Sequence, residues 1–187
     1  MTAGGAGEGP VVLLEGVRKA FGGRQILDGV SFEVARGRAF CLLGRSGSGK
    51  SVTLRHIVGL VQPDEGRVLV EGRDVPRLSR RELTVVRRRI GFLFQEAALF
   101  DSITVGENVA FPLVRHTKMS HGEIRKRATE RLAEVGLADE YGKMPGNLSG
   151  GMRKRVGLAR AMALDPAVLL VDEPSAGLDP ITSAEID

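Results

Sequence analysis

The sequence of 187 residues contains no tryptophan, one tyrosine and one cysteine. A single cysteine excludes an internal disulfide, which favours a reducing compartment. We expect Cys41 to be a small buried side chain, because it lies in the apolar run AFCLLG. No apolar run approaches the length that crosses a bilayer, which excludes a transmembrane helix within these residues. The length suits one aliphatic-cored domain, or one domain with an insertion.

The sequence also lacks a strong charge of either sign. Lys and Arg number 27 against 23 Asp and Glu, a formal net charge of +4. This excess suits an anionic partner such as a nucleotide or a lipid surface, although solvated basic helix faces are the simpler explanation. Residues 1–10, MTAGGAGEGP, are small and glycine-rich, so we expect a flexible N-terminus and no signal peptide.

Short apolar runs predict the strands. VVLLEGVRKAF (11–21) and GVSFEV (29–34) are typical of two strands that the turn GGRQ separates. RAFCLLG (38–44) is a continuous apolar run, as expected of a strand that is buried on both faces. Three similar runs predict further strands, at 66–72, 90–95 and 167–174.

Helical patterns lie between and after these strands. A helix is expected from Lys50 to about Leu60, and others follow after residue 96. TVGE (104–107) and SHGE (120–123) match the capping box, and Ser149 is a candidate N-cap for a third helix. In the second of these helices one apolar face is expected, formed by Ile124, Ala128, Leu132 and Val135. The order predicts an α/β fold, a mixed sheet with an inserted helical subdomain at about 96–160.

The segment GRSGSGKS, at 44–51, fits the phosphate-loop pattern G-x-x-x-x-G-K-[ST]. Its glycines let the backbone curl so that its amides converge on phosphate oxygens, and the following helix adds its positive end. Lys50 offers a charge to the β- and γ-phosphates, and Ser51 Oγ can ligate Mg²⁺. A glycine-rich turn that meets a lysine by chance is the alternative, which the flanking strand and helix disfavour. The predicted nucleotide-binding residues are Gly44, Arg45, Ser46, Gly47, Ser48, Gly49, Lys50, Ser51 and Val52.

A pair of carboxylates ends the last apolar run. Magnesium needs further oxygen ligands, often reached through water, and Asp172 can supply one. Side chains alternate along a strand, so Glu173 points elsewhere and can orient or deprotonate an attacking water. Two surface acids at a strand end are the alternative, which the phosphate loop on the same chain weakens.

With LSGGM at 148–152, the set of motifs resembles the ATP-binding cassette (ABC) ATPases. The phosphate loop, Gln95 in FLFQ, LSGGM, LLVDEP and SAGLDP follow the order and spacing of that family from about Val11 onward. A narrower similarity, to ATPase subunits of Mla/Mce-type phospholipid transporters, rests on FQEAALFDSITVGENVAFPL, on Met152 in place of the commoner Gln, and on DPIT at 179–182. Polar amino-acid importers and other cassettes share much of this framework.

The resemblance implies roles at the matching positions. Phe21 in KAFGG would stack on adenine, with a core phenylalanine as the alternative. Gln95 would act as a catalytic and metal-sensing residue that links Mg²⁺ and the attacking water to the membrane partner, with an ordinary strand-end amide as the alternative. Asp179 would help to couple the two sites of a dimer.

The signature residues Ser149, Gly150 and Gly151 would close on the γ-phosphate that the other subunit of a homodimer holds. Free amides and the positive helix end suit that anion. Met152 cannot reproduce the hydrogen bonds of a glutamine. The three histidines match no family site, so we interpret them as structural or surface residues: His56, His116 and His121.

The family pattern continues with a further strand and a histidine that contacts the γ-phosphate, and no histidine follows the DEP of this sequence. That strand is expected between the phosphate-loop strand and the Asp–Glu strand. We therefore expect an incomplete sheet in an ABC ATPase domain at 11–187 whose C-terminal part is missing. We also expect these residues alone to be poorly stable and to hydrolyse ATP weakly or not at all.

The intact protein is thus expected to be a Mg²⁺-dependent ABC-type ATPase that binds ATP and energises a membrane transporter, with phospholipid as the cargo that the narrower resemblance implies. The expected partners are a second ATPase subunit, transmembrane permease subunits and a lipid-binding Mce-type component, but no nucleic acid. The expected location is cytoplasmic, on the inner face of the inner membrane. The alternatives are an ABC importer or exporter ATPase for another cargo, a soluble cassette that acts on nucleic acid or ribosomes, and a nucleotide-binding module without turnover.

Overall fold

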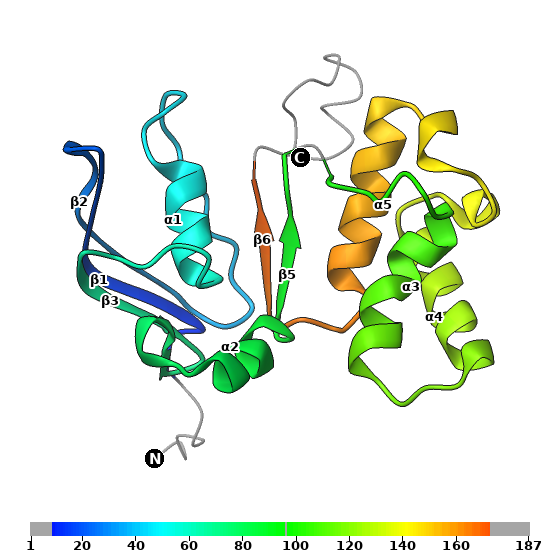
Figure 1. The fold of residues 1–187 in the computed structure, drawn as a ribbon, viewed down its shortest axis with the longest axis horizontal. Coiled ribbons are helices and arrows are strands. Elements are labelled where there is room, and N and C mark those ends of the chain that lie inside the picture. Colours follow the sequence, from blue (N-terminus) through cyan, green and yellow to red (C-terminus); the bar gives the residue numbers. More distant parts are fainter. Residues whose placement is uncertain (1–8, 96, 173–187) are drawn as a thin grey trace, which may run out of the picture. The chain divides into compact units, whose positions relative to one another are not determined.

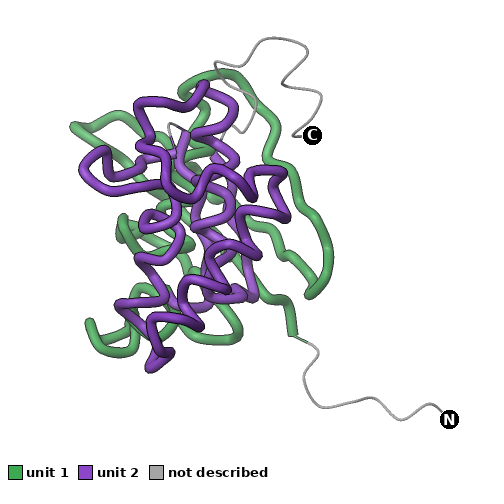
Figure 2. The backbone as a smooth tube through the Cα atoms, turned by 90° about the vertical axis from the view of Figure 1, so that its right-hand side faces the viewer, with its two compact units in different colours: residues 1–87 green, residues 88–187 purple. Residues whose placement is uncertain are grey.

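The computed structural model describes residues 9–95 and 97–172, and the chain divides into two compact units, Met1–Arg87 and Arg88–Asp187 (Figure 2). The first unit contains an antiparallel sheet with helices, and the second contains a parallel strand pair with helices. The α/β fold class and the mixed strand directions predicted from the sequence are confirmed.

The sheet of the first unit has the strand order β2-β1-β3-β4, and every neighbouring pair is antiparallel. Figure 1 labels β1, β2 and β3 of this sheet. Its strands are β1 (Val12–Phe21), β2 (Arg24–Val34), β3 (Glu65–Val70) and β4 (Arg73–Asp74). β2 begins earlier than predicted, because Gly22 and Gly23 (φ 55° and 80°) turn the chain within two residues. Valine and leucine side chains on one face form the core of this unit, namely Val12, Leu14, Val17, Val68 and Val70.

The register between β1 and β3 shifts between Glu15 and Arg18, and Gly66 makes this irregularity possible. Gly66 has φ +90°, and a Cβ there would lie 2.5 Å from the carbonyl oxygens of both Glu15 and Gly16. Backbone therefore approaches backbone so closely that only glycine fits at this position.

Helix α1 (Lys50–Ile57) follows the phosphate loop as predicted. Its buried His56 lies with Nδ1 2.7 Å from the carbonyl oxygen of Val52. Burial lowers the pKa of His56, which favours the neutral ring and agrees with its interpretation as a structural residue.

The segment after β4 was not predicted from the sequence. It forms a short 3₁₀ turn at Val75–Arg77 and helix α2 (Arg80–Arg87), whose start is capped by reciprocal contacts between Ser79 and Glu82. At the other end of α2, Arg87 donates from Nε to the carbonyl of Val58 and from its terminal nitrogen to that of Gly59, both at 2.9 Å. These bonds satisfy carbonyls at the end of α1 and tie the two helices together.

The strand predicted at 38–44 is wrong for the part of the chain that the structure describes. These residues form no ladder, Phe40 and Leu43 are 48% and 88% exposed, and Cys41 is exposed instead of buried. A short apolar run becomes a buried strand only if a neighbour pairs with its backbone and covers its faces, and no described strand does so. The ring of Phe40 stacks on that of Phe32 of β2, with the ring centroids 4.6 Å apart.

The second unit is built around β5 (Ile90–Leu93) and β6 (Val168–Val171), which pair in parallel (Figure 1). Among residues 9–95 and 97–172, β6 has no neighbouring strand other than β5. Helix α5 (Gly150–Met162) packs on β5, and Gly91 permits the contact because a Cβ there would lie 2.4 Å from the carbonyl oxygen of Ala161.

Three helices form the helical part of this unit: α5, α3 (Val105–His116) and α4 (His121–Glu134). Both predicted capping boxes are confirmed. The Thr104 and Ser120 amides each donate to the carboxylate three residues later at 2.7 Å. The amide and the hydroxyl of Thr104 lower the pKa of Glu107, and the hydroxyl and the amide of Ser120 lower the pKa of Glu123. Short 3₁₀ turns at Ala138–Glu140 and Pro145–Asn147 lead from α4 to α5.

The helices share one aliphatic core. It consists of Val105, Val109, Ala110, Leu113, Ile124, Ala128, Leu132, Leu137, Leu148, Val156, Ala159 and Ala163. Three of the four apolar positions predicted for the second helix are in this core, and Val135 packs against it. No helix in the described ranges is long and apolar enough to cross a membrane.

Replacing Gly66 by alanine should destabilise the first unit far more than replacing Gly72. Gly72 also has a left-handed backbone (φ +75°) but has open space around its Cβ position, so Gly72→Ala costs about 1–2 kcal/mol of backbone strain. Gly66→Ala adds a clash with two carbonyl oxygens, worth about a further 1–3 kcal/mol. Urea unfolding of both variants measures the difference, and equal losses would contradict this packing.

Candidate functional site

The phosphate loop takes a backbone shape that depends on its glycines. Gly47 and Gly49 have φ values of 79° and 97°. Gly49 is also packed from behind, since a Cβ there would lie 2.6 Å from Cδ2 of Leu27 and 3.2 Å from the carbonyl oxygen of Ile26. A side chain at position 49 would therefore displace the loop from β2 as well as strain its backbone.

Gly49 is the N-cap of α1 and offers no capping side chain to the first turn of the helix. The Gly49 carbonyl instead accepts from the amide of Thr53 at 2.8 Å and from its hydroxyl at 3.0 Å. The N-cap residue therefore offers no side-chain oxygen of its own to the helix. The positive end of a helix favours an anion.

Lys50 folds back over this loop. Its Nζ donates to the carbonyl oxygens of Gly44 and Arg45 at 2.9 and 3.1 Å, while the Ser48 amide closes a turn onto Arg45 at 3.1 Å. Amides, one ammonium group and the Ser51 hydroxyl beside them are the donor set that fits a nucleotide phosphate together with Mg²⁺. Arg45, Ser46, Gly47 and Ser48 are exposed, so the loop is accessible to a ligand.

Phe21, the residue predicted to stack on adenine, is the last residue of β1. Its ring is 48% exposed, and the ammonium of Lys19 lies 5.3 Å from the ring centroid. An exposed aromatic ring beside a cation can stack on a nucleotide base, whereas the alternative of a core phenylalanine requires burial.

In the second unit, Gln95 and Asp172 follow the carboxyl ends of β5 and β6. Leu93 lies opposite Val171 in this parallel pair, and the amide of Asp172 donates to the carbonyl of Leu93 at 3.0 Å. Asp172 is 6% exposed, whereas Gln95 is exposed. The two predicted metal-sensing residues therefore lie at the same edge of the strand pair.

Within the described ranges, no group of three or more His, Cys, Asp or Glu residues could form a closed metal cage. Mg²⁺ retains water and takes few ligands from a protein, so binding of Mg²⁺ does not require such a cage. The phosphate loop belongs to the first unit, and Gln95, Asp172 and Ser149 belong to the second.

The signature segment begins α5. The hydroxyl of Ser149 accepts from the amide of Met152 at 3.2 Å, which confirms the predicted N-cap. Gly150 is exposed, with open space around its Cβ position, so a ligand could approach its backbone. Met152 packs against the helical core, which explains how an apolar side chain is accommodated there. The two other predicted site residues, Glu173 and Asp179, lie outside the described residues.

Sequence reasoning missed Asn108, which organises the loop between β5 and α3. Its side chain is fully buried, its Oδ1 accepts from the amide of Phe100 at 2.8 Å, and its Nδ2 donates to the carbonyls of Phe100 and Thr104, both at 3.0 Å. The sequence did contain a signal for this role: Asn108 lies between the core positions Val105 and Val109 of α3. A polar side chain that is buried at such a position needs hydrogen-bond partners.

Sequence reasoning also missed Arg160, whose guanidinium donates to the carbonyls of Ala97 and Ala98 in the same loop. Burial lowers the pKa of Arg160. Its position in a run of basic residues, RKRVGLAR, gave no reason to separate it from the solvated arginines of the helix.

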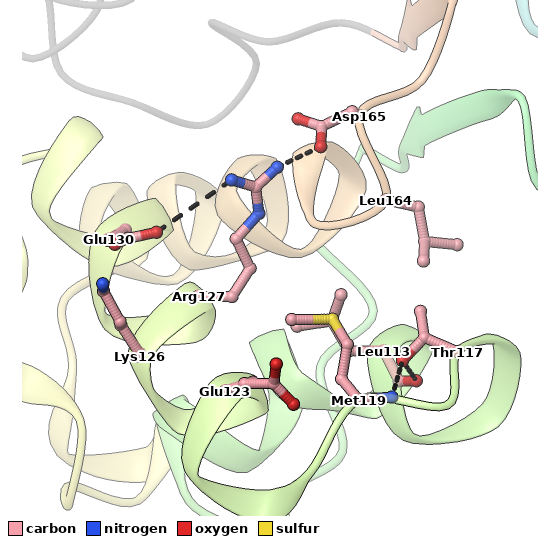
Figure 3. Close-up of a pocket in the computed structure, with 9 residues that line it drawn as sticks. All are labelled: Leu113, Thr117, Met119, Glu123, Lys126, Arg127, Glu130, Leu164 and Asp165. Carbon is pink, nitrogen blue, oxygen red and sulfur yellow. Dashed lines mark hydrogen bonds and ion pairs between the residues drawn. The ribbon is translucent and has the colours of Figure 1, made fainter.

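A hollow of about 380 Å³ lies elsewhere in the second unit, between α3, α4 and the turn after α5 (Figure 3). Leu113, Met119 and Leu164 contribute apolar surface, and Arg127 pairs with Asp165 at its rim. None of the predicted site residues lines this hollow.

Comparison with known proteins places this geometry in a family. The model of the family described as ABC transporter matches residues 27–176. A probable ribonucleotide transport ATP-binding protein, Mkl of Mycobacterium leprae, is 45% identical over 184 residues, covering 97% of this chain and 53% of its own length. The chloroplastic protein TRIGALACTOSYLDIACYLGLYCEROL 3 of Arabidopsis thaliana is 46% identical over 178 residues, covering 91% and 51%.

Among solved structures, the ATP-binding cassette MJ0796, in a dimeric post-hydrolysis state bound to ADP and Pi, superposes with a TM-score of 0.85. It is 38% identical, and the match covers 94% of this chain and 79% of that one. The chain spans about half the length of the curated relatives it matches. The residues matched by the family model include the phosphate loop, the strand pair that ends in Gln95 and Asp172, and the LSGG helix start, and the chain belongs to the ABC transporter family.

Proposed function

We propose that the protein containing this chain binds ATP with Mg²⁺, hydrolyses it as one subunit of a cassette dimer, and so drives a transmembrane permease. The observation that carries the proposal is the phosphate loop, where the left-handed Gly47 and Gly49 shape the backbone and Nζ of Lys50 donates to the carbonyls of Gly44 and Arg45. Membership of the ABC transporter family and the likeness to a cassette bound to ADP and Pi support it.

Different residues of the chain bind the nucleotide, hold the metal and activate the water. Loop amides and Lys50 bind the β- and γ-phosphates, and Phe21 orients the nucleotide through its base. Bound Mg²⁺ would neutralise phosphate charge, with Ser51, Gln95 and Asp172 as its protein ligands. Glu173 orients the attacking water and accepts its proton.

Dimer formation completes each site. Ser149, Gly150 and Gly151 present the start of α5 to the γ-phosphate held by the other subunit, and Asp179 contributes to coupling between the two sites. This arrangement requires close approach of the partner's nucleotide, and the open surface of Gly150 supports it.

The roles of Lys50 and Glu173 can be separated by substitution. Lys50→Ala removes a charged donor, and ATP affinity should fall about 10- to 100-fold. Glu173→Gln keeps the donors but removes the base, so ATP affinity should change little while turnover falls about 100- to 10,000-fold and an ATP-bound dimer accumulates. Equilibrium ATP binding, phosphate release and gel filtration with ATP measure these effects. Equal loss of binding in both variants would refute the division of roles.

An exposed apolar patch marks the proposed surface for the permease. Phe100 and Phe111 are 45% and 43% exposed with ring centroids 4.9 Å apart, and Val114 is 57% exposed. The patch lies on the loop after Gln95 and on α3. A partner bound there would therefore contact the segment that follows Gln95 at the carboxyl end of β5. Clustered exposed aromatic side chains are typical of protein interfaces.

Phe111→Asp should weaken association with the permease about 10-fold or more, because a charge replaces an aromatic contact. ATP affinity should remain unchanged, since the substitution is remote from the phosphate loop in sequence and is on the surface. Co-purification from membranes measures the association. Val85→Asp, at a residue of α2 that is equally exposed at 44%, is the matched control. Similar effects of both variants would remove this surface from the proposal.

We further propose that the cargo is a phospholipid and that the cassette works at the inner face of the cell membrane with a lipid-binding Mce-type component. The segment FQEAALFDSITVGENVAFPL, Met152 and the DPIT sequence support this choice, as does a relative whose name contains that of a galactolipid. The relative named for ribonucleotide transport represents the other cargo class, a small solute.

Reconstitution distinguishes the two cargo classes. The permease that co-purifies is placed in vesicles that contain labelled phospholipid on one side. ATP should drive the label across or out of the bilayer with the unaltered subunit and should not do so with Glu173→Gln. ATP-dependent accumulation of a ribonucleotide or an amino acid, with no movement of lipid, would replace this cargo assignment without affecting the ATPase.

A further inference from the structure

The loop between β5 and α3 contains a backbone conformation that alanine rarely adopts. Ala97 and Ala98 have φ values of 59° and 48°, in the left-handed region. The Ala97 amide donates to the carbonyl of Phe94 at 2.9 Å, so Ala97 is bonded to the residue that directly precedes Gln95. A strained turn persists only if surrounding contacts hold it.

Arg160 of α5 provides such contacts from more than sixty positions along the chain. Its two terminal nitrogens donate to the carbonyls of Ala97 and Ala98 at 2.6 and 2.9 Å. The guanidinium also lies 6.0 Å from the ring centroid of Phe100. The planar fork of an arginine can bind two adjacent carbonyls at once, which the single ammonium of a lysine cannot reproduce in the same geometry.

Gly157, one turn earlier in α5, brings the helix against the same turn. A Cβ at position 157 would lie 2.9 Å from Cβ of Ala97 and 2.8 Å from Cδ1 of Leu93. Ala97 is 1% exposed, so its methyl group occupies the space that the glycine leaves. The helix that begins at Ser149 therefore contacts the Gln95 turn through both its backbone surface and Arg160.

We propose that Arg160, supported by Gly157, is a positioning residue that holds the Ala97–Ala98 turn in its left-handed form and thereby places Gln95. The inference rests on the proposed function for the role of Gln95. It assigns a further role to α5: the helix whose start presents the signature residues also fixes the loop that carries the metal-sensing glutamine. A shift of α5 would move both together.

Arg160→Gln removes the guanidinium that donates to both carbonyls, so the backbone of Ala97 and Ala98 should leave the left-handed region. Hydrogen exchange of the amides in residues 94–98 should accelerate, because the Ala97 amide is no longer held in its hydrogen bond to the carbonyl of Phe94. ATP affinity should stay within about 3-fold, while turnover falls about 10- to 100-fold and the Mg²⁺ concentration for half-maximal turnover rises. Arg155→Gln is the matched control on the same helix, where the arginine donates instead to the carbonyl of Val135 at 3.4 Å. It should change none of these quantities.

The rescue variant separates positioning from general stability. Ala98 is exposed, so Ala98→Gly removes little packing but lets the left-handed conformation form without strain. Added to Arg160→Gln, it should restore slow exchange at 94–98 and recover much of the turnover. If Arg160→Gln does not fold, Arg160→Lys replaces it in the same comparison. We expect faster exchange at 94–98 in Arg160→Lys than in the unaltered chain.

Two results would overturn the role of Arg160 in holding the turn: unchanged exchange at 94–98 in Arg160→Gln, or faster exchange that Ala98→Gly does not reverse. A lowered melting temperature with normal turnover per folded molecule would overturn its role in placing Gln95. The exchange measurement does not depend on catalysis. Absence of ATP hydrolysis by the unaltered protein would therefore count against the proposed function, while exchange alone decides whether Arg160 holds the turn.

Discussion

Close approach of one backbone segment to another is the constraint on which this molecule depends. Gly49 lets the phosphate loop lie against β2, and Gly91 and Gly157 let α5 lie against β5 and the turn after it. At each position a single methyl group would come within 2.4 to 2.9 Å of a neighbouring atom. Because protein interiors are close-packed, such a clash would shift the whole element and with it the residues that the element presents.

The helices differ in whether a side chain caps their first amides. α3 and α4 begin with complete capping boxes, in which Thr104 and Ser120 satisfy the free amides internally. α1 begins after Gly49, which has no side chain to cap the helix. α5 is intermediate, since Ser149 accepts one amide while the surface at Gly150 stays open. Side-chain caps thus stabilise the starts of α3, α4 and α5, whereas a glycine of the phosphate loop precedes α1.

The loop from Ala97 to Thr104 is held at two places by side chains from the helices. Arg160 bonds to its first two residues, and the buried Asn108 bonds to Phe100 and Thr104, so the segment is fixed although it has no regular structure. Between the two anchors, Phe100 presents an aromatic surface to solvent. A partner that binds this surface acts on a loop with two fixed points, a suitable geometry for transmitting contact at the surface to the edge where Gln95 and Asp172 lie.

Local sequence determined the phosphate loop, both capping boxes, the N-cap at Ser149 and most strands, because each depends on residues within one turn of one another. Tertiary structure decided the rest. The run 38–44 has the composition of a buried strand, yet it is exposed because pairing requires a neighbour that its own residues do not specify. Arg160 resembles the other arginines of its helix until the fold brings the carbonyls of Ala97 and Ala98 beside it. Such contacts between distant residues have no periodicity, so only the folded chain reveals them.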